Sequence, residues 1–471
     1  MSNFIIVICI FAFTYVVEGS WNVTINHNPN CNLSKECDKY DVIYINGRNL
    51  TSSVHVFITA SERFSLPSIL IIHSSSAEAN PVIEWDHLNV SSGKRLTVGN
   101  VTQSYALVFY KMLEYNDLSD DVNMSIYPRN ADQIRIHHLN EYNWKRNSNN
   151  DSSLSFEDNL FEITYNGTSP KMTSPYEQVI IKFRISNTTQ HHKYMPHLLF
   201  KPGWIVQFDV LFNNLTSHFN QSRFGLQLMM MSNLTLDPTE EFRKEVLLSI
   251  DDELTPGNFE MTNILLGESV SKINNNDTNE QYFKNSTNPS AFIQIKPACF
   301  IDNHLRTVQN SRNVYISKHQ DLLDNNNNNI SQFDLINYTF PSIFYADRLN
   351  DPSNNNNSQL KPISIRLLNV SFGTSTDGFY AKSKFIFYYL LQIFKPSTLF
   401  AFSRTASFGL GNPPTDNLSS LLIGLIIFSM LIIVSSVVLG ILLVIVLRRS
   451  TTVINNDRQP ILSHFVNDPI A

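Results

Sequence analysis

Three consecutive acidic residues, Asp251, Asp252 and Glu253, are the first group in this chain whose types and spacing could do chemistry. Adjacent carboxylates can ligate Ca²⁺ or supply the acid and base of a glycosidase. Neighbouring side chains of a strand point to opposite faces, so only Asp251 and Glu253 could share one face. A Pro-Gly pair follows and indicates a strand end that enters a turn. We therefore interpret residues 249–253 as a structural segment, with a cation site, a partner contact or catalysis as the alternatives.

Two histidine pairs, His137-His138 and His191-His192, are the second candidate. Adjacent residues of a strand do not converge on one metal ion, and the sequence offers no third ligand near either pair. The chain also contains no G-x-S-x-G, H-E-x-x-H, P-loop or C-x-x-C motif. We therefore predict solvent-facing histidines, no catalytic, cofactor-binding or metal-binding residues, no cofactor, and a protein that is not an enzyme.

N-glycosylation acceptors are the most abundant motif, with nineteen N-x-S/T sequons that all precede one long apolar run. Such sequons matter only where the chain faces the secretory lumen. Their distribution therefore predicts a lumenal region before the apolar run. The predicted acceptors are Asn22, Asn32, Asn49, Asn89, Asn100, Asn123, Asn150, Asn166, Asn187, Asn214, Asn220, Asn233, Asn276, Asn285, Asn329, Asn337, Asn356, Asn369 and Asn417.

The two ends of the chain agree with this topology. Residues 1–19 resemble a signal peptide, although no basic residue precedes the apolar stretch, so an uncleaved signal anchor is the alternative. Residues 421–447 carry no charge and are long enough to span a bilayer. Arg448 and Arg449 follow at once, which predicts a cytosolic tail over residues 448–471 and a type I membrane protein.

The net charge and the cysteines restrict the possible partners and disulfides. The net charge of −6 argues against a nucleic-acid partner. Cys9 lies in the predicted signal peptide, and Cys31 and Cys37 are close enough in sequence to form a disulfide across a short loop. Cys299 is then unpaired, either as a buried small hydrophobe or as an intermolecular thiol.

Short runs rich in Val, Ile and aromatic residues, each bounded by turn residues, indicate strands almost throughout the lumenal region. Strands at this spacing, without helical patterns between them, predict an all-β lumenal region plus one C-terminal transmembrane helix. The expected strands cover residues 42–45, 54–59, 68–73, 82–88, 105–115, 133–139, 161–165, 178–186, 204–212, 224–231, 291–301, 313–317 and 364–372.

The lumenal region is too long for one sandwich, so we expect two packed β-sandwich-like domains. The predicted divisions are a first β domain over residues 20–155, a second over residues 156–396, and a stalk over residues 397–420. Asparagine runs cannot build a core and indicate loop insertions in these domains. They lie at residues 147–150, 274–276, 325–329 and 354–357.

The tail carries a candidate sorting signal. Asp457, three spacer residues, and then Ile461 and Leu462 resemble the acidic dileucine signal for endosomes and lysosomes. A clathrin adaptor can hold such a peptide through a basic patch and an apolar pocket. Within the span, Ser436 and Gly440 form a small-xxx-small pair that leaves a homodimer open, although ordinary membrane-helix composition explains the pair equally well.

Several short segments are each weak evidence for a family, but their order and spacing together are fairly specific. In chain order they cover residues 66–70, 82–85, 104–109, 113–114, 223–226, 249–253 with Pro256 and Phe259, and 369–373 with Ser375 and Thr376. With the single span that follows, they resemble the glycosylated lysosomal membrane protein family over nearly the whole lumenal region.

This resemblance implies a non-enzymatic, heavily glycosylated type I protein of the lysosome membrane. It implies an accessory subunit that pairs with a polytopic major-facilitator transporter and shields it from lysosomal proteases. It also recasts residues 249–253 as a structural or contact segment of the family. Two departures limit the transfer: the tail has no tyrosine for a tyrosine-based sorting signal, and Val206 and Arg366 stand where lumenal cysteines are expected.

The aromatic and aliphatic run at residues 385–394 is our candidate for the contact with the transporter, with a final core strand as the alternative. Two rival functions remain open. A lysosomal hydrolase predicts a deep pocket with convergent carboxylates. A cell-surface adhesion or receptor ectodomain predicts surface residence that is independent of Ile461 and Leu462.

Overall fold

The structure is a computed structural model that divides into two compact units, Met1–Pro414 and Thr415–Ala471. We call the described part of the first unit the β unit. The structure describes residues 21–31, 35–61, 64–88, 95–119, 131–147, 154–169, 178–191, 198–213, 218–219, 222–233, 243–251, 257–268, 289–297, 299–300, 308–309, 339–349, 364–371, 402–415 and 420–456.

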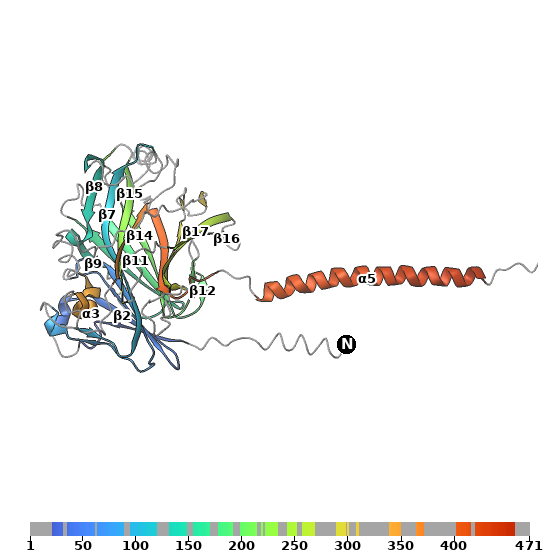
Figure 1. Cartoon of the computed structure of the whole chain (residues 1–471), viewed down its shortest axis with the longest axis horizontal. Coiled ribbons are helices and arrows are strands. Elements are labelled where there is room, and N and C mark those ends of the chain that lie inside the picture. Colours follow the sequence, from blue (N-terminus) through green and yellow to red (C-terminus); the bar gives the residue numbers. More distant parts are fainter. Residues whose placement is uncertain are drawn as a thin grey trace, which may run out of the picture. The chain divides into compact units, whose positions relative to one another are not determined.

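The first sheet of the β unit has eight described strands, all paired antiparallel, in the order β1-β2-β3-β4-β7-β15-β21, with β8 paired to β7. Figure 1 shows β7 and β15 side by side. The strands are β1 (Asn22–His27), β2 (Val42–Arg48), β3 (Ser53–Thr59), β4 (Ser68–Ser74), β7 (Val101–Asn116), β8 (Ile134–His138), β15 (Ser222–Ser232) and β21 (Ser364–Ser371).

The second sheet also has eight described strands, again antiparallel, in the order β16-β17-β18-β22-β14-β11-β10-β9. They are β9 (Asn143–Arg146), β10 (Leu160–Thr168), β11 (Gln178–Ser186), β14 (Ile205–Asn213), β16 (Arg243–Asp251), β17 (Gly257–Glu268), β18 (Pro289–Pro297) and β22 (Phe402–Leu410).

Short elements complete the described residues. Three two-stranded sheets pair β5 (Val82–Ile83) with β6 (Leu96–Thr97), β12 (Gln190–His191) with β13 (Leu199–Phe200), and β19 (Cys299–Phe300) with β20 (Val308–Gln309). The 3₁₀ helices are η2 (Lys35–Lys39), η3 (Trp85–His87), η5 (Ala131–Gln133) and η6 (Leu139–Glu141). The α-helices are α3 (Phe340–Leu349) and α5 (Ser420–Asn456).

One apolar core joins the two sheets. The ring of Phe109 in β7 lies 5.8 Å from that of Phe183 in β11 and 5.1 Å from that of Phe208 in β14, and all three are buried. In β11 the buried apolar residues Val179, Ile181, Phe183 and Ile185 occupy alternate positions, which is the period of a strand with one face on a core. Two polar residues of the other face, Arg184 and Ser186, are buried as well. The inner faces of the sheets therefore pack on each other as in a sandwich.

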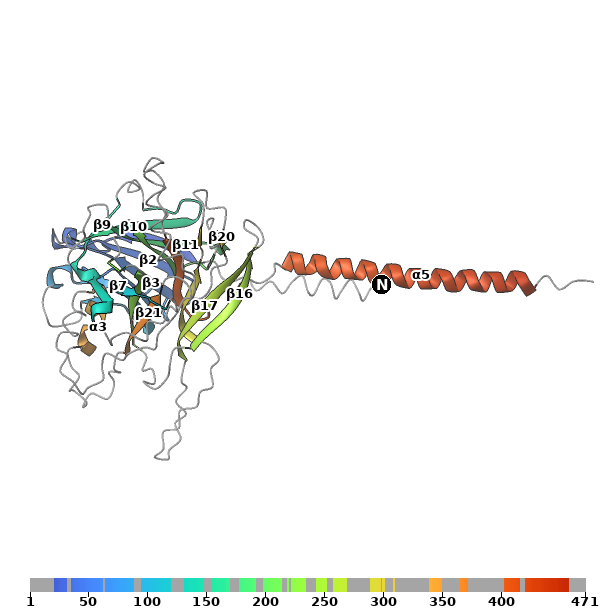
Figure 2. The ribbon, with the colours of Figure 1, turned by 90° about the horizontal axis from the view of Figure 1, so that it is seen from above.

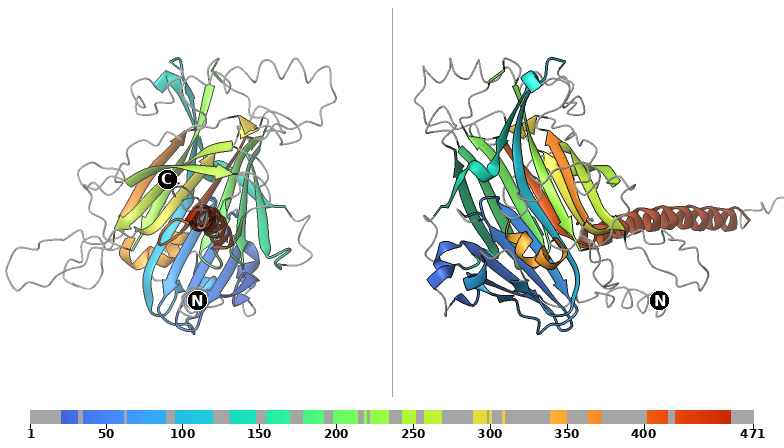
Figure 3. Two further views of the ribbon diagram at one scale, coloured as in Figure 1. Left: turned by 90° about the vertical axis from the view of Figure 1, so that its right-hand side faces the viewer. Right: turned by 60° about the vertical axis from the view of Figure 1, so that its left-hand side comes forward.

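The opposite face of the first sheet is covered by helix α3, which lies against its blue strands in Figure 3. The ring of Phe340 lies 5.5 Å from that of Phe57 in β3. Tyr345 Oη donates to Ser104 Oγ in β7 at 3.0 Å. Because both of its faces are covered, β7 is buried almost continuously rather than in alternation.

Glycine permits a close approach between β2 and the segment before β14. A Cβ on Gly47 in β2 would lie 3.1 Å from Cα of Gly203, which has a φ of +86° that favours glycine. Beside this contact, the rings of Trp21 and Trp204 meet edge to face with centroids 4.5 Å apart. The N-terminal edge of the first sheet is thus pinned to the second sheet.

Most expected strands appear where the alternation predicted them, and the all-β class is confirmed. The expectation at residues 82–88 is wrong beyond Ile83, because the chain turns into η3 there and Trp85 Nε1 donates to Pro29 O at 3.0 Å. The segment at residues 313–317, the signal peptide, three of the four asparagine runs and the rest of the fourth beyond Asn147 lie outside the described residues.

The sheets do not follow the division at residue 155. Strand β9 precedes that boundary yet pairs with β10, and β15 and β21 follow it yet belong to the first sheet. A boundary there would cut both sheets. Each of the two sheets in the described β unit contains strands from before and after residue 155.

Part of the segment expected as a stalk is a strand of the second sheet. Strand β22 pairs with β14 and β18, and its residues 406–410 are all buried. The stalk was predicted from glycine and proline residues near the span, but a Cβ on Gly409 would lie 3.0 Å from both the Phe292 ring and Trp204 O. This glycine therefore allows close packing within a sheet.

The second unit is the helix α5. The segment Ile426–Arg449 of this helix has a mean hydropathy of 3.2, and none of it is buried. It is long and apolar enough to cross a membrane. It overlaps the predicted span at residues 421–447, and it is the one such helix among the described residues.

Two buried polar contacts connect β7 to β15 and the residues beside them. Arg223 forms an ion pair with Asp117, and their side chains are 3% and 5% exposed. Glu114, which is 1% exposed, accepts hydrogen bonds from Ser222 Oγ and from the backbone N–H of His218. These are the groups whose loss would leave a buried charge without its partner.

We predict that Asp117→Asn lowers the free energy of unfolding by about 3–5 kcal/mol, because the buried Arg223 keeps its charge but loses the carboxylate of Asp117. Urea unfolding of the purified chain can be followed by tryptophan fluorescence, since all four tryptophans lie in the β unit. Glu36→Gln is the matched control, because its partner Lys39 is 46% exposed and the pair contributes little. Equal effects of the two changes would contradict the prediction.

Candidate functional site

The acidic segment singled out by sequence lies at the end of a hairpin. Strand β16 pairs with β17 so that Ser249 faces Phe259 and Asp251 faces Gly257. Figure 2 shows this hairpin at the rim of the second sheet. Asp252 and Glu253 lie outside the described residues. The register agrees with the interpretation of a strand end entering a turn.

The histidine pairs do not gather metal ligands in the described part of the chain. His137 and His138 belong to β8, and His191 belongs to β12, while His192 is not described. The one described group of three potential ligands is Cys31, Cys37 and Asp38. The two cysteines form a disulfide with Cα atoms 5.8 Å apart, so their thiolates are not available to a metal.

Seven of the predicted acceptor asparagines are described. Asn22 and Asn100 are exposed, whereas Asn49, Asn166, Asn187, Asn233 and Asn369 are partly buried. Asn233 Oδ1 accepts from the backbone N–H of Ser104 at 2.8 Å. The remaining predicted site residues lie outside the described residues: Asn32, Asn89, Asn123, Asn150, Asn214, Asn220, Asn276, Asn285, Asn329, Asn337, Asn356, Asn417, Asp457, Ile461, Leu462 and the segment 385–394.

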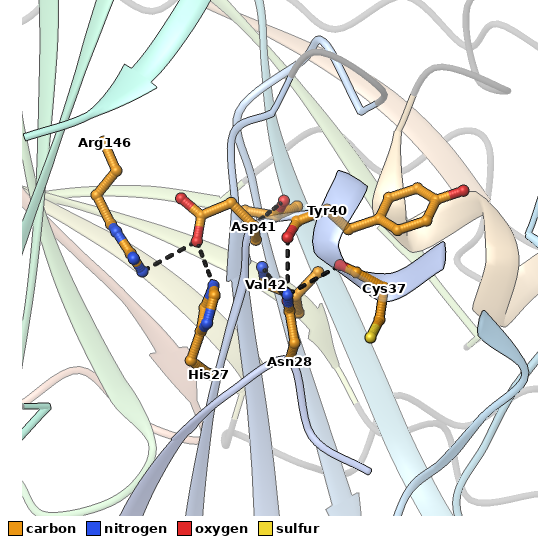
Figure 4. A network of polar contacts seen from close by, with 8 residues as sticks. His27, Asn28, Cys37, Tyr40, Asp41, Val42 and Arg146 are labelled. Atoms are coloured by element: carbon orange, nitrogen blue, oxygen red, sulfur yellow. Dashed lines mark hydrogen bonds and ion pairs between the residues drawn. The ribbon is translucent and has the colours of Figure 1, made fainter. Parts of the chain in front are cut away.

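The disulfide loop is held to the first sheet by Asn28 (Figure 4). Asn28 is 5% exposed and has a φ of +43°, a conformation that asparagine tolerates. Its Nδ2 donates to the carbonyl oxygens of Cys37 and Tyr40 at 3.0 and 2.8 Å, and its Oδ1 accepts from Val42 N–H at 3.0 Å. One side chain thus fixes both ends of the turn that precedes β2.

Asp41 forms a second anchor beside this loop (Figure 4). Its Oδ1 accepts from His27 Nε2 at 2.9 Å and from Arg146 Nη1 at 3.0 Å. His27 belongs to the first sheet and Arg146 to β9 of the second sheet. The carboxylate therefore connects the two sheets at one edge.

A polar pocket of about 490 Å³ opens at this edge. It lies over β1 and β2, and we call it the β1–β2 pocket. Strand periodicity places Tyr44, Asn46 and Arg48 on one face of β2, and polar residues of β1 oppose them. The lining consists of Asn22, Thr24, Asn26, His27, Asn28, Pro29, Asn30, Tyr44, Asn46, Arg48, Asn80 and Pro81.

The floor of the β1–β2 pocket is polar but bears little charge. Among the described residues no carboxylate lines it, and Arg48 donates from Nη2 to Asn80 Oδ1 at 2.6 Å. Asn46 Oδ1 and Arg48 Nε are buried and have no hydrogen-bond partner in the described structure. Two buried atoms, an acceptor and a donor, are thus unsatisfied on neighbouring positions of one strand face.

Behind the floor, Tyr44, His55 and Ser53 form a hydrogen-bonded chain. Tyr44 Oη lies 2.8 Å from His55 Nδ1, and His55 Nε2 lies 3.0 Å from Ser53 Oγ. Burial raises the pKa of the Tyr44 phenol, and burial together with Arg48 lowers the pKa of His55 to about 4. Ser53 and His55 are both 0% exposed, and Ser53 Oγ donates to Ser76 O at 2.7 Å. Such a serine cannot reach a substrate, so this row of three hydrogen-bonded side chains has a structural role.

Sequence reasoning missed the β1–β2 pocket. Its signal was the alternation of polar residues in β2, Tyr44, Asn46 and Arg48, against apolar Ile43 and Ile45. Most segments that carry the family resemblance lie elsewhere, on the adjacent strands β4, β7, β15 and β21. The buried Glu114 and Arg223 belong to those segments.

The described residues form a large β-rich region followed by one C-terminal helix that is long and apolar enough to span a membrane. The profile of the family described as "Glycosylated lysosomal membrane protein" matches residues 41–451. The chain belongs to the glycosylated lysosomal membrane protein family, and it is a lysosomal membrane protein with its span near the C-terminus.

Named relatives agree with this family. The chain is 26% identical over 379 residues to the glycosylated lysosomal membrane protein of Danio rerio, covering 78% of this chain and 74% of the relative. It is 22% identical over 430 residues to glycosylated lysosomal membrane protein B of Xenopus laevis, covering 88% and 87%. The A form of Xenopus laevis is also 22% identical, with coverage of 88% and 86%.

We predict that His55 makes the β unit less stable as the pH falls towards lysosomal values. The unfolded chain binds a proton below about pH 6.5, whereas folded His55 binds one only near pH 4, so stability is lost on acidification through this window. The loss amounts to about 2 kcal/mol at pH 5 relative to pH 7.5.

Urea unfolding of wild type and His55→Gln at both pH values measures this loss. The variant should lack that part of the pH dependence, while the exposed-histidine control His191→Gln should keep it. The same pH dependence in wild type and His55→Gln would refute the assignment.

Proposed function

We propose that this protein is a non-enzymatic accessory subunit that stabilises a polytopic major-facilitator transporter in the lysosome membrane and protects it from proteolysis. The observation that carries the proposal is the family match across residues 41–451, which includes the β unit from Asp41 onward and the span.

The physical basis of protection is poor access for proteases. Cleavage needs an extended, accessible segment, whereas most described residues of the β unit belong to paired strands. Glycans on the lumenal asparagines would add steric cover. A transporter loop beneath such a surface would be hidden from the lumenal proteases.

The common membrane lowers the affinity that the lumenal contact requires. Two proteins held in one bilayer meet at a high effective concentration, so a modest contact suffices. Residues 385–394 remain our first candidate for this contact. The hairpin strand β16 is a second, because it ends the second sheet and exposes Val246 and Leu247 by 45% and 36%. Edge strands with apolar side chains are commonly covered by a partner.

We predict that the full chain, purified from lysosomal membranes in mild detergent, recovers one multispanning transporter reproducibly. Mass spectrometry of the eluate identifies it, and another single-span lysosomal glycoprotein is the control bait. Recovery of no polytopic protein above that control would refute the proposed role.

Surface variants sharpen the same experiment. Val246→Lys combined with Leu247→Lys should reduce recovery of the transporter if β16 contributes to the contact. Leu50→Lys is the matched control, because Leu50 is 97% exposed and lies between β2 and β3 of the other sheet. If neither the Val246 and Leu247 double variant nor Leu50→Lys changes recovery of the transporter, the contact lies on another surface. Residues 385–394 are then the next segment to test.

The sorting proposal has its own test. We predict that Ile461→Ala with Leu462→Ala moves the protein to the cell surface, because a clathrin adaptor loses the two aliphatic side chains it would bind. Surface biotinylation measures this, with Ile470→Ala in the same tail as the control. Normal lysosomal delivery of the double variant would exclude this signal and leave the accessory role untouched.

A further inference from the structure

The β1–β2 pocket lies beside a glycan acceptor. In the antiparallel register, Asn22 faces Arg48, Thr24 faces Asn46 and Asn26 faces Tyr44. Directly opposed residues have Cβ atoms about 5 Å apart and share one face of the sheet. Asn22 is exposed, begins the sequon Asn22-Val23-Thr24, and itself lines the pocket. Any group attached to its side chain starts at the pocket wall.

The pocket floor offers the chemistry that a sugar needs. Asn46 is 5% exposed, its Oδ1 accepts no hydrogen bond, and Arg48 Nε donates none. A buried acceptor near a buried donor matches hydroxyl and acetamido groups, which both donate and accept. Among the described lining residues, six are asparagines and Arg48 alone has a fixed charge. This lining suits a neutral polyhydroxylated ligand better than an anion.

We propose that the N-glycan of Asn22 folds back into the β1–β2 pocket, where its innermost N-acetylglucosamine bonds to Asn46 and Arg48. The volume of about 490 Å³ is within the usual range for sites that enclose a small ligand. The inference requires a lumenal β unit but does not depend on the transporter partner.

The bound glycan would protect an exposed edge of the β unit. Strand β1 ends the first sheet, pairs only with β2 among the described strands, and has an exposed and intermediate burial pattern. Edge strands near a chain terminus open easily and are sites of proteolysis. A glycan that bridges β1 and β2 closes this edge, in addition to the Trp21–Trp204 contact.

The first test compares glycan release at two sites of the same molecule. Full-length protein from a secretory host is treated with a peptide N-glycosidase while folded, and glycopeptide mass spectrometry follows Asn22 and the exposed acceptor Asn100. We expect release at Asn22 to be at least about tenfold slower than at Asn100, and the rates to become equal after denaturation. An unoccupied Asn22, or equal rates in the folded protein, would overturn the proposal.

Pocket variants provide the second test. Asn46→Leu preserves the approximate side-chain volume, and Arg48→Lys preserves the charge but removes Nε. Together they should raise the rate of release at Asn22 to that at Asn100. Unchanged slow release in a folded double variant would overturn the assignment of these residues.

A third measurement does not depend on how well the pocket variants fold. Asn22→Gln removes the glycan and should speed amide hydrogen exchange in β1 by about tenfold. Asn100→Gln is the matched control and should leave β1 unchanged. Equal exchange in β1 with and without the Asn22 glycan would count against the proposal.

Discussion

The packing of two antiparallel sheets on one apolar core is the constraint on which the rest of this molecule depends. Phe109 from the first sheet meets Phe183 and Phe208 from the second, and this contact needs strands from distant parts of the chain. Strands β15 and β21 return to complete the first sheet, and β22 enters the second sheet shortly before the span. The core therefore connects the N-terminal edge to the segment that leads into the membrane.

Much of the fold could be predicted because period-2 alternation is a local signal. Strand β11 coincides with its prediction at residues 178–186, since Val179, Ile181, Phe183 and Ile185 all face the core. Strand β22 was missed because Gly409 resembles a linker residue, while its role is to admit the Phe292 ring. Strand order and the exchange of strands across residue 155 depend on pairings between distant segments, which no local pattern specifies.

The candidate site was less accessible from sequence. The disulfide of Cys31 and Cys37 followed from their spacing, but its attachment through Asn28 depends on carbonyl groups that only the folded turn presents. The β1–β2 pocket likewise depends on the register that places Asn22 opposite Arg48. Each sequon can be recognised from three residues of sequence. The residues that surround each acceptor asparagine depend on how the strands pair in the folded sheet.

Family membership and the C-terminal span identify a lysosomal membrane protein, and the role that we propose for it is to cover a partner transporter. The most direct measurement is the half-life of the partner transporter in lysosomes, followed by pulse labelling and quantitative mass spectrometry in cells with and without this protein. The account predicts a several-fold shorter half-life without it, restored by lysosomal protease inhibitors. An unchanged half-life would contradict it.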